Sequence, residues 1–358
     1  MVPTPTAPAA PPTAATGKIN VALLLPLSGP NAAVGQAMLN AAQMALFDLA
    51  DERLELLTHD TQGSATGAAS AAQAAVGEGA QLILGPLLAG EVEAVKPIAS
   101  GAHIPVVAFS TATQLAGGGV YLMGFTPSQD IARVTAYAHA NGHNNFAALV
   151  PQSPYGQVVA EAVRAAVAAN GGNLVRTEFY DATINDMAAT VRRFAGEGHD
   201  YDALFLAEGD GRLKALAPQL PYFNIDPAQV KLLGTGLWDE PGLGSEPALD
   251  GAWYAAPAPQ SRAAFEKRYR ELYKTAPPRL ATLGYDAAAL AAVLSRSPQG
   301  PDFSPATLTS PNGYAGVDGI FRLRADGLVQ RGLAVLEVQR DGGSVIDQAP
   351  TTFQTLGY

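Results

Sequence analysis

The stretch that decides the fold runs from Ile19 to Leu49 and reads INVALLLPLSGPNAAVGQAMLNAAQMALFDL. It begins with a β-rich apolar run, Ile19–Leu25, and its Ala-rich part, Ala32–Leu49, has the apolar spacing of a helix. A turn that contains Pro26 and Gly29 separates the two parts. The sequence therefore predicts a strand followed directly by a helix.

The same alternation continues along the chain. Further stretches with strand or helix patterning are Leu54–Thr58, Thr66–Gly77, Gln81–Leu84, Gly90–Ser100, Ile104–Phe109, Asn145–Val150, Tyr155–Ala169, Asn173–Phe179, Asn185–Ala195, Ala203–Leu206, Gly211–Leu216 and Lys231–Gly234. Strands that alternate with helices pair in parallel, and the crossover helices cover both faces of the sheet. The predicted fold class is therefore α/β with open parallel sheets flanked by helices.

A chain of 358 residues is long enough for two lobes. The segment Tyr121–Pro127 divides the two series of elements and suits a connection between lobes. After the second series, Ser261–Lys274 and Ala281–Ser295 are helical in pattern, and Gly319–Leu323 and Arg331–Arg340 are predicted closing strands. In such lobes, ligands bind beyond the carboxyl ends of the parallel strands. Two lobes of this kind form a cleft that can close on a small molecule.

The composition excludes several classes of partner. With 22 Lys and Arg against 32 Asp and Glu, the formal net charge is −10, which argues against nucleic acid and anionic lipid. Hydrophobic residues make up 48% of the chain and charged residues 15%, enough for packed cores. The absence of cysteine removes disulfides, thiolate nucleophiles and cysteine-bound metals.

The N-terminal segment has a composition of its own. From residue 2 to residue 16, every residue except Val2 is Pro, Thr or Ala, so residues 1–17 are predicted to be a disordered linker. A tether of this kind indicates an exported, periplasmic protein whose precursor carries an export segment and a lipid-modified cysteine. An unstructured tail on a cytosolic protein is the alternative. The apolar runs are too short for a transmembrane segment.

Several short motifs occur in order across residues 18–358, and together they resemble the type I periplasmic binding proteins. The motifs are Val21–Pro30, Gly35-Gln36, Asp60–Gln62, Leu82–Pro86, Ile104–Ser110, Pro154–Gly156, Leu233–Trp238 and Leu283–Ala287. Within that superfamily, the chain is similar to the leucine/isoleucine/valine-binding branch. The opening motif and the Leu233–Trp238 run are most similar to bacterial penicillin-binding-protein activator lipoproteins.

The resemblance implies two Rossmann-like lobes joined by a hinge of three crossing segments. Residues 18–125 plus 257–315 would form lobe 1, and residues 126–256 plus 316–358 would form lobe 2. The resemblance also implies a non-catalytic protein without cofactors, whose cleft closes on a small molecule such as an amino acid.

The resemblance assigns six ligand-binding residues to lobe 1: Ser28, Leu88, Ala89, Ser110, Thr111 and Thr113. Members of the family bind the ligand carboxylate with hydroxyls and backbone amides of these loops. Thr113 best matches the carboxylate-binding threonine, whereas Leu88 and Ala89 stand where a serine is usual. For the hydroxyls of the Ser110–Thr113 loop, capping of their own loop is an equal alternative.

In lobe 2, Tyr155 matches the tyrosine that covers the ligand, with local packing at the helix start as the alternative. The acid that receives the ligand ammonium is missing from the loop after Lys231–Gly234. Glu208 is one possible replacement, although acids in such loops are more often solvated. Trp238 either stacks on a ligand or fills the lobe core.

No catalytic motif stands out. The sequence has no nucleophile elbow, phosphate-binding loop or zinc helix, so no catalytic residue or metal site is predicted. His139 and His143 have the spacing of two metal ligands on a helix, but a surface helix end explains them better. Asp60 is interpreted as a helix cap.

Two functions stay open. The first is a solute-binding protein that delivers a small, amino-acid-like molecule to a membrane permease of an ABC-type transporter, or senses it. The second is an envelope lipoprotein that activates a peptidoglycan synthase through protein–protein contact. The Pro-rich tether and the missing ligand groups motivate the second.

Overall fold

The computed structural model describes residues 17–49, 52–183, 186–196, 198, 200–240, 242–296, 300–340 and 342–353. Except for Gly17, the predicted linker 1–17 lies outside these described residues. By its internal contacts, the chain divides into two compact units. Unit 1 contains the described residues up to Gly124, then Phe265–Val317 and Arg322–Val329. Unit 2 contains Phe125–Ala264, Asp318–Phe321 and the described residues from Gln330 onward.

Unit 1 is built on a five-stranded sheet of order β2-β1-β3-β4-β5. Its strands are β1 (Ile19–Leu25), β2 (Leu54–Asp60), β3 (Leu82–Leu84), β4 (Val106–Ala108) and β5 (Val120–Leu122). All neighbouring strands pair in parallel. The middle strands are apolar on both faces, as a sheet covered on both sides requires.

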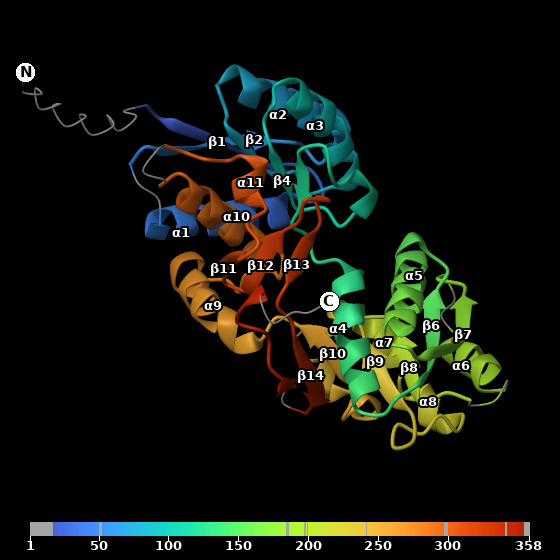
Figure 1. The fold of residues 1–358 in the computed structure, drawn as a ribbon. Helices are drawn as coiled ribbons and strands as arrows, with labels where there is room; N and C mark the ends of the chain where they lie inside the picture. The colour runs from blue at the N-terminus through green and yellow to red at the C-terminus, as the bar shows by residue number, and fades with distance from the viewer. Residues whose placement is uncertain are drawn as a thin grey trace, which may run out of the picture. The chain divides into compact units, whose positions relative to one another are not determined.

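Helices cover both faces of this sheet (Figure 1). The helices of unit 1 are α1 (Ala32–Leu49), α2 (Ala65–Gly77), α3 (Ala89–Gly101), the 3-10 helix η1 (Thr113–Leu115), α10 (Ala281–Leu294) and α11 (Pro305–Leu308). Helices α2 and α3 pack together with the sheet in one apolar cluster. Helix α1 packs on α10. Helix α9 (Pro259–Tyr273) begins in the span of unit 2 and ends in that of unit 1.

Strand β5 was not predicted from the sequence, because it overlaps the segment Tyr121–Pro127 that was interpreted as a connection. The backbone N–H of Leu122 donates to the carbonyl of Gly327 at 2.7 Å, and Leu122 pairs in parallel with Leu328. A late piece of chain thus covers the outer edge of β5.

Unit 2 contains a seven-stranded sheet of order β15-β14-β10-β9-β8-β6-β7. Its strands are β6 (Asn145–Pro151), β7 (Asn173–Tyr180), β8 (Ala203–Leu206), β9 (Lys231–Gly234), β10 (Trp253–Ala256), β14 (Ala334–Gln339) and β15 (Gly342–Asp347). The five strands from β10 to β7 are parallel, and β14 and β15 are added as an antiparallel pair.

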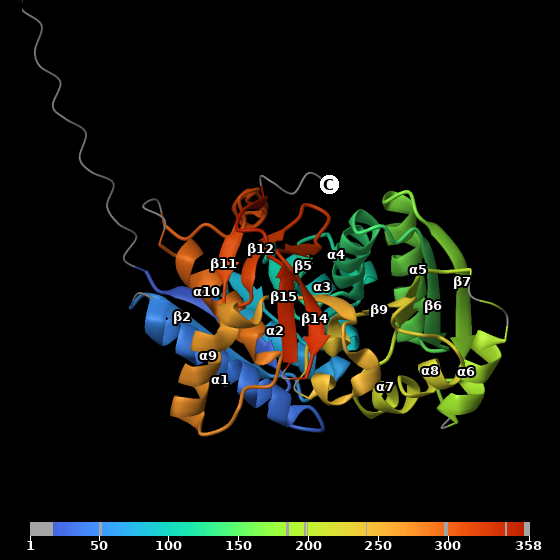
Figure 2. The same cartoon turned by 90° about the horizontal axis from the view of Figure 1, so that it is seen from below.

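Two layers of helices cover this sheet as well. The helices of unit 2 are α4 (Pro127–Ala140), α5 (Pro154–Ala169), α6 (Met187–Ala195), α7 (Asp210–Leu216), α8 (Gln219–Tyr222) and the 3-10 helices η2 (Gly236–Trp238), η3 (Leu243–Ser245) and η4 (Pro247–Leu249). Figure 2 shows α4 and α5 on one side of the strands and α6 to α8 on the other, which matches the two apolar clusters. The predicted start of α6 at Asn185 lies outside the described residues.

A small third sheet of β11 (Tyr314–Gly316), β12 (Gly319–Leu323) and β13 (Val329–Arg331) lies in the last part of the chain. The chain passes between the units after Gly124, after Ala264 and within Asp318–Val329, which belongs partly to each. The predicted fold class, an α/β protein with parallel sheets flanked by helices, is confirmed. Among the described helices, none is long and apolar enough to cross a membrane.

Candidate functional site

The predicted ligand residues all follow the carboxyl ends of parallel strands. In unit 1, Ser28 lies in the exposed loop after β1, and its backbone N–H donates to Asp60 Oδ1 at 3.2 Å. The N–H groups of Leu27 and Gln62 donate to the same oxygen at 2.8 and 2.7 Å. Asp60 therefore closes the loops after β1 and β2. Its interpretation as a helix cap is wrong, because Ser64 caps α2 and the amides that Asp60 accepts from lie in loops.

These bonds change the acidity of Asp60. Burial works to raise its pKa, but hydrogen bonds from the Ser28 side chain and from the backbone of Gln62, Leu27 and Ser28 outweigh burial and lower the pKa. The hydroxyl of Ser28 is thus engaged with Asp60, and its predicted contact with a ligand stays a prediction.

The loop after β3 contains Leu88 and Ala89. The N–H of Leu88 donates to Glu91 Oε2 at 3.0 Å, and the hydroxyl of Thr61 donates to Glu91 Oε1 at 2.5 Å. Glu91 and Thr61 are both buried, so the first turn of α3 is fixed to the loop after β2. Ala89 is exposed and offers backbone only. Because first-turn N–H groups of a helix have no partner within the helix, this loop can receive an anion through its amides.

The loop after β4 contains three hydroxyl groups. Ser110 is buried, and its Oγ accepts a hydrogen bond from the N–H of Ala112 at 3.2 Å. The Ser110 hydroxyl therefore shapes its own loop, as the capping alternative expects. Thr111 and Thr113 are exposed, and they are the hydroxyl groups of this loop that a ligand can reach. The N–H of Phe109 donates to the carbonyl of Pro86 at 2.9 Å, which holds this loop beside the loop after β3.

In unit 2, Tyr155 occupies the first turn of α5, which Ser153 caps by accepting from the N–H of Gly156 at 3.1 Å. The Tyr155 hydroxyl is 2.8 Å from Thr235 Oγ1 in the loop after β9. Because β8 lies between β6 and β9, this bond spans the carboxyl end of β8. Burial raises the pKa of Tyr155 to about 12, nearby Asp130 and Glu208 add to the rise, and the bond to Thr235 opposes it. Tyr155 is therefore neutral and can donate a hydrogen bond at neutral pH.

Asp130 is the residue of this site that sequence reasoning missed. It lies in the first turn of α4, is only 9% exposed, and its Oδ2 accepts from the N–H of Gly236 at 3.1 Å. Its carboxylate therefore reaches the loop after β9, whose own residues Thr235–Trp238 include no acid. The signal that could have found it is an acid just after Pro127, since acids favour the first turn of a helix.

Glu208, directly after β8, is not a solvated loop residue. It is buried, accepts from Arg212 Nε at 3.0 Å, and receives a hydrogen bond from the Tyr180 hydroxyl. Burial and the bond to Glu208 raise the pKa of Tyr180 well above its usual value. Because Arg212 balances its charge within unit 2, Glu208 is a poor partner for a ligand cation.

Trp238 takes the core position, one of the two interpretations that the sequence left open. It is fully buried, its Nε1 donates to the Glu208 carbonyl at 2.9 Å, and its ring packs near Tyr254. Asp239 and Glu240, two further acids close to Trp238, are also engaged. Asp239 forms two bonds with Arg262 at 2.6 and 2.9 Å, and Glu240 accepts from the N–H of Asp210 at 3.0 Å.

The arrangement suits binding by hydrogen bonds and one carboxylate. Asp130, Tyr155 and Thr235 gather at the carboxyl edge of unit 2, and Thr111 and Thr113 lie at that of unit 1. Within the described part of the chain, no group of three or more His, Asp or Glu side chains is placed to hold a metal ion.

The sequence of this chain is similar to those of known proteins. A family model described as periplasmic binding protein matches residues 18–343. The protein RP748 of Rickettsia prowazekii is 24% identical over 58% of this chain and 58% of its own length. A protein of Rhizobium johnstonii named Leu/Ile/Val-binding protein BraC3 is 28% identical over 51% of this chain and 53% of its own length. The chain thus spans little more than half the length of these relatives.

Solved structures share the fold over nearly the whole chain. A candidate branched-chain amino acid ABC transporter protein from Rhodospirillum rubrum has a TM-score of 0.80 at 22% identity, with 92% of this chain and 100% of that chain covered. LivJ of Streptococcus pneumoniae in complex with isoleucine has a TM-score of 0.66 at 19% identity, with 93% and 100% covered. A Rhodopseudomonas palustris solute-binding protein in complex with 3,4-dihydroxybenzoic acid has a TM-score of 0.67 at 20% identity, with 93% and 96% covered.

Proposed function

This chain belongs to the periplasmic binding protein family, and from that premise we propose that it binds a small amine-bearing molecule, an amino acid or a close relative, without chemically changing it. Family membership implies a periplasmic location. We further propose that the bound molecule is delivered to a membrane permease of an ABC-type transporter.

The observation that carries this proposal is the position of Asp130. A buried ammonium needs a carboxylate partner, because an unpaired buried charge costs several kcal/mol. Asp130, from the first turn of α4, supplies that carboxylate beside the loop after β9, with the hydroxyls of Tyr155 and Thr235 in the same region. In unit 1, the exposed hydroxyls of Thr111 and Thr113 and the first-turn amides of α3 suit a carboxylate.

The relatives support this class of ligand. The names and titles of the matched proteins refer to leucine, isoleucine and valine, but also to an aromatic acid that carries no amine. Asp130 favours an amino acid over such an acid, because two negative charges repel each other.

The test is calorimetry on the full chain, refolded to remove any bound molecule. We expect heat and a raised melting temperature with at least one L-amino acid and none with benzoate. Asp130→Asn should weaken the amino acid about 10- to 100-fold, since a hydrogen bond to a charged group contributes about 1.5–3 kcal/mol. Asp250→Asn, at an exposed turn of unit 2, is the matched control and should leave affinity unchanged. No heat with any amino acid, or equal affinity for the Asp130 variant, would refute the proposal.

A second candidate is an envelope lipoprotein that activates a peptidoglycan synthase by direct contact. It is favoured by the side chains that satisfy each other internally: Ser28 with Asp60, Ser110 with its own loop, and Glu208 with Arg212. The full chain should then retain a penicillin-binding protein on a resin and raise its rate of glycan polymerisation. An unchanged rate at saturating protein would exclude this function.

A further inference from the structure

A pocket of about 500 Å³ lies in unit 1 at the edge of the sheet opposite the candidate site. Its lining includes Gln81, Pro105 and Gly119, which immediately precede β3, β4 and β5. Because these strands are parallel, their amino ends share one edge, away from the loops that carry Thr111 and Thr113. A volume of this size falls in the range of small-molecule sites.

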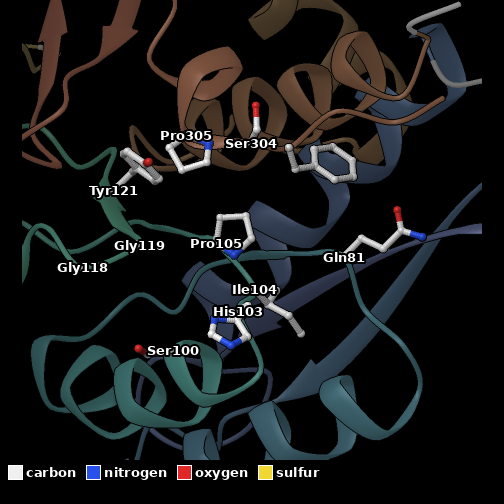
Figure 3. Close-up of a pocket in the computed structure, with 11 residues that line it drawn as sticks. Gln81, Ser100, His103, Ile104, Pro105, Gly118, Gly119, Tyr121, Ser304 and Pro305 are labelled. Carbon is white, nitrogen blue, oxygen red and sulfur yellow. The ribbon is translucent and has the colours of Figure 1, made fainter. Parts of the chain in front are cut away.

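The pocket combines flat apolar walls with neutral polar groups. Figure 3 shows Tyr121 and Pro305 next to each other above Pro105, with His103 below it. Phe303 adds a second aromatic ring and is buried. Among the described residues that line the pocket, none is an aspartate, glutamate, lysine or arginine.

Tyr121 is the lining residue that can offer a hydrogen bond to a ligand. The residue is only 5% exposed and lines the pocket. Among the described residues, no hydrogen bond from its hydroxyl is found. The hydroxyl oxygen of Tyr121 is not one of the fully buried, unpartnered side-chain atoms, so it is open to the pocket, and a bound molecule can pair with it in place of water. Burial raises the pKa of Tyr121, so the hydroxyl stays protonated and can donate.

The electrostatics disfavour an anion. The pocket includes Ser100 and His103, which lie at the carboxyl end of α3, a helix of 13 residues. The carboxyl end of a helix carries partial negative charge, which repels anions. The described residues of the lining include no lysine or arginine that would offset that charge.

We propose that this pocket is a second binding site, for a small uncharged aromatic molecule with an amide or hydroxyl group, and that Tyr121 orients it. The apolar rings of Pro105, Pro305 and Phe303 hold the aromatic body, and the Tyr121 hydroxyl pairs with its polar group. This site is independent of the proposed amino-acid site.

The test uses two probes of equal shape and different charge, benzamide and benzoate, with the full chain. Saturation-transfer NMR should show saturable binding of benzamide with a dissociation constant of about 1 mM, and much weaker binding of benzoate. Tyr121→Phe should weaken benzamide about fivefold, because one hydrogen bond is lost. Tyr222→Phe, an exposed tyrosine of unit 2, should change nothing.

A blocking variant keeps the test independent of the Tyr121 substitution. Ser100 is exposed near the end of α3, so Ser100→Trp should fold and fill the pocket, and benzamide binding should be lost. Ser70→Trp, on the exposed side of α2, is the matched control and should retain binding. Asp130→Asn should also retain it, which separates this pocket from the amino-acid site.

Three results would overturn the proposal: equal binding of benzamide and benzoate, unchanged benzamide binding in Tyr121→Phe, or retained binding in Ser100→Trp. Crystals of the full chain soaked with benzamide give a direct check. Electron density for benzamide against Tyr121 is expected. A pocket filled instead by the N-terminal segment or by a second copy of the chain would refute the small-molecule site.

Discussion

At the scale of single residues, polar side chains beyond the strand ends fall into two groups. Asp60 and Ser110 use their oxygen atoms to close their own loops, whereas Thr111 and Thr113 are exposed. Sequence cannot separate the groups, because the same residue types cap loops and bind ligands. Only the position of each side-chain oxygen relative to the neighbouring backbone amides decides between the two roles.

Asp60 makes a testable contribution to acid stability. Its pKa is lower in the folded protein than in the unfolded chain, so its ionised form stabilises the fold above the unfolded value of about 3.9. This stabilisation is lost as the pH falls through the lowered folded value. We therefore expect the unfolding free energy of the wild type to fall more steeply below about pH 4 than that of Asp60→Asn.

Denaturant titrations between pH 5 and pH 2 measure this difference. Asp250→Asn, at an exposed turn, serves as the control and should follow the wild type. Parallel curves for the wild type and the Asp60 variant would show that the carboxylate contributes nothing to folding.

At the scale of elements, Gly236 sets how closely α4 approaches the loop after β9. A Cβ atom built on Gly236 would lie 2.2 Å from Asp130 Oδ2, so Gly236→Ala must displace that carboxylate. We expect a loss of about 1–3 kcal/mol in the unfolding free energy, as for other overpacked sites, together with weaker amino-acid binding. Thermal and denaturant unfolding provide the measurement.

Gly77→Ala is the matched control for this substitution. No atom lies within 4 Å of a Cβ built on Gly77, at the end of α2, so alanine should be neutral or stabilise by up to about 1 kcal/mol. Equal stability of the Gly236 variant and the wild type would mean that Asp130 moves without cost.

Elements with a strong periodic pattern could be predicted from the sequence. The bounds of β1, α1, β8 and β9 match the predicted stretches residue for residue. Strand β5 was not predicted, because it has only the three residues Val120–Leu122 and overlaps the segment Tyr121–Pro127 that was interpreted as a connection. Helix α4 was anticipated only at its end, through the interpretation of His139 and His143. The first turn of α4 was not predicted, and Asp130 lies in that turn and not in a loop after a strand, so the sequence did not assign it to the site.

At the scale of the whole molecule, unit 2 is completed by strands from the end of the chain. Strand β10 pairs with β14 from Trp253 opposite Glu337 to Ala256 opposite Ala334. A fragment of residues 125–264 keeps the parallel strands but lacks β14 and β15. Its apolar β10 edge would be uncovered, so we expect aggregation and no cooperative unfolding transition.

Circular dichroism and light scattering check this expectation. Joining residues 125–264 to residues 330–353 through a glycine–serine linker restores β14 and β15 and should restore a cooperative transition. A cooperative transition in the fragment of residues 125–264 alone would show that the antiparallel pair is dispensable.

The cover over β5 also bears on the order of events during synthesis. Leu122 pairs with Leu328, about two hundred residues later, so the edge of β5 stays open while most of the chain emerges from the ribosome. An open strand edge is a template for pairing with other chains. We therefore expect nascent chains that end before Gly327 to depend on chaperones that hold unfolded chains. Truncations in the last tenth of the sequence should likewise cause unit 1 to misassemble, although all five strands of its main sheet were synthesised much earlier.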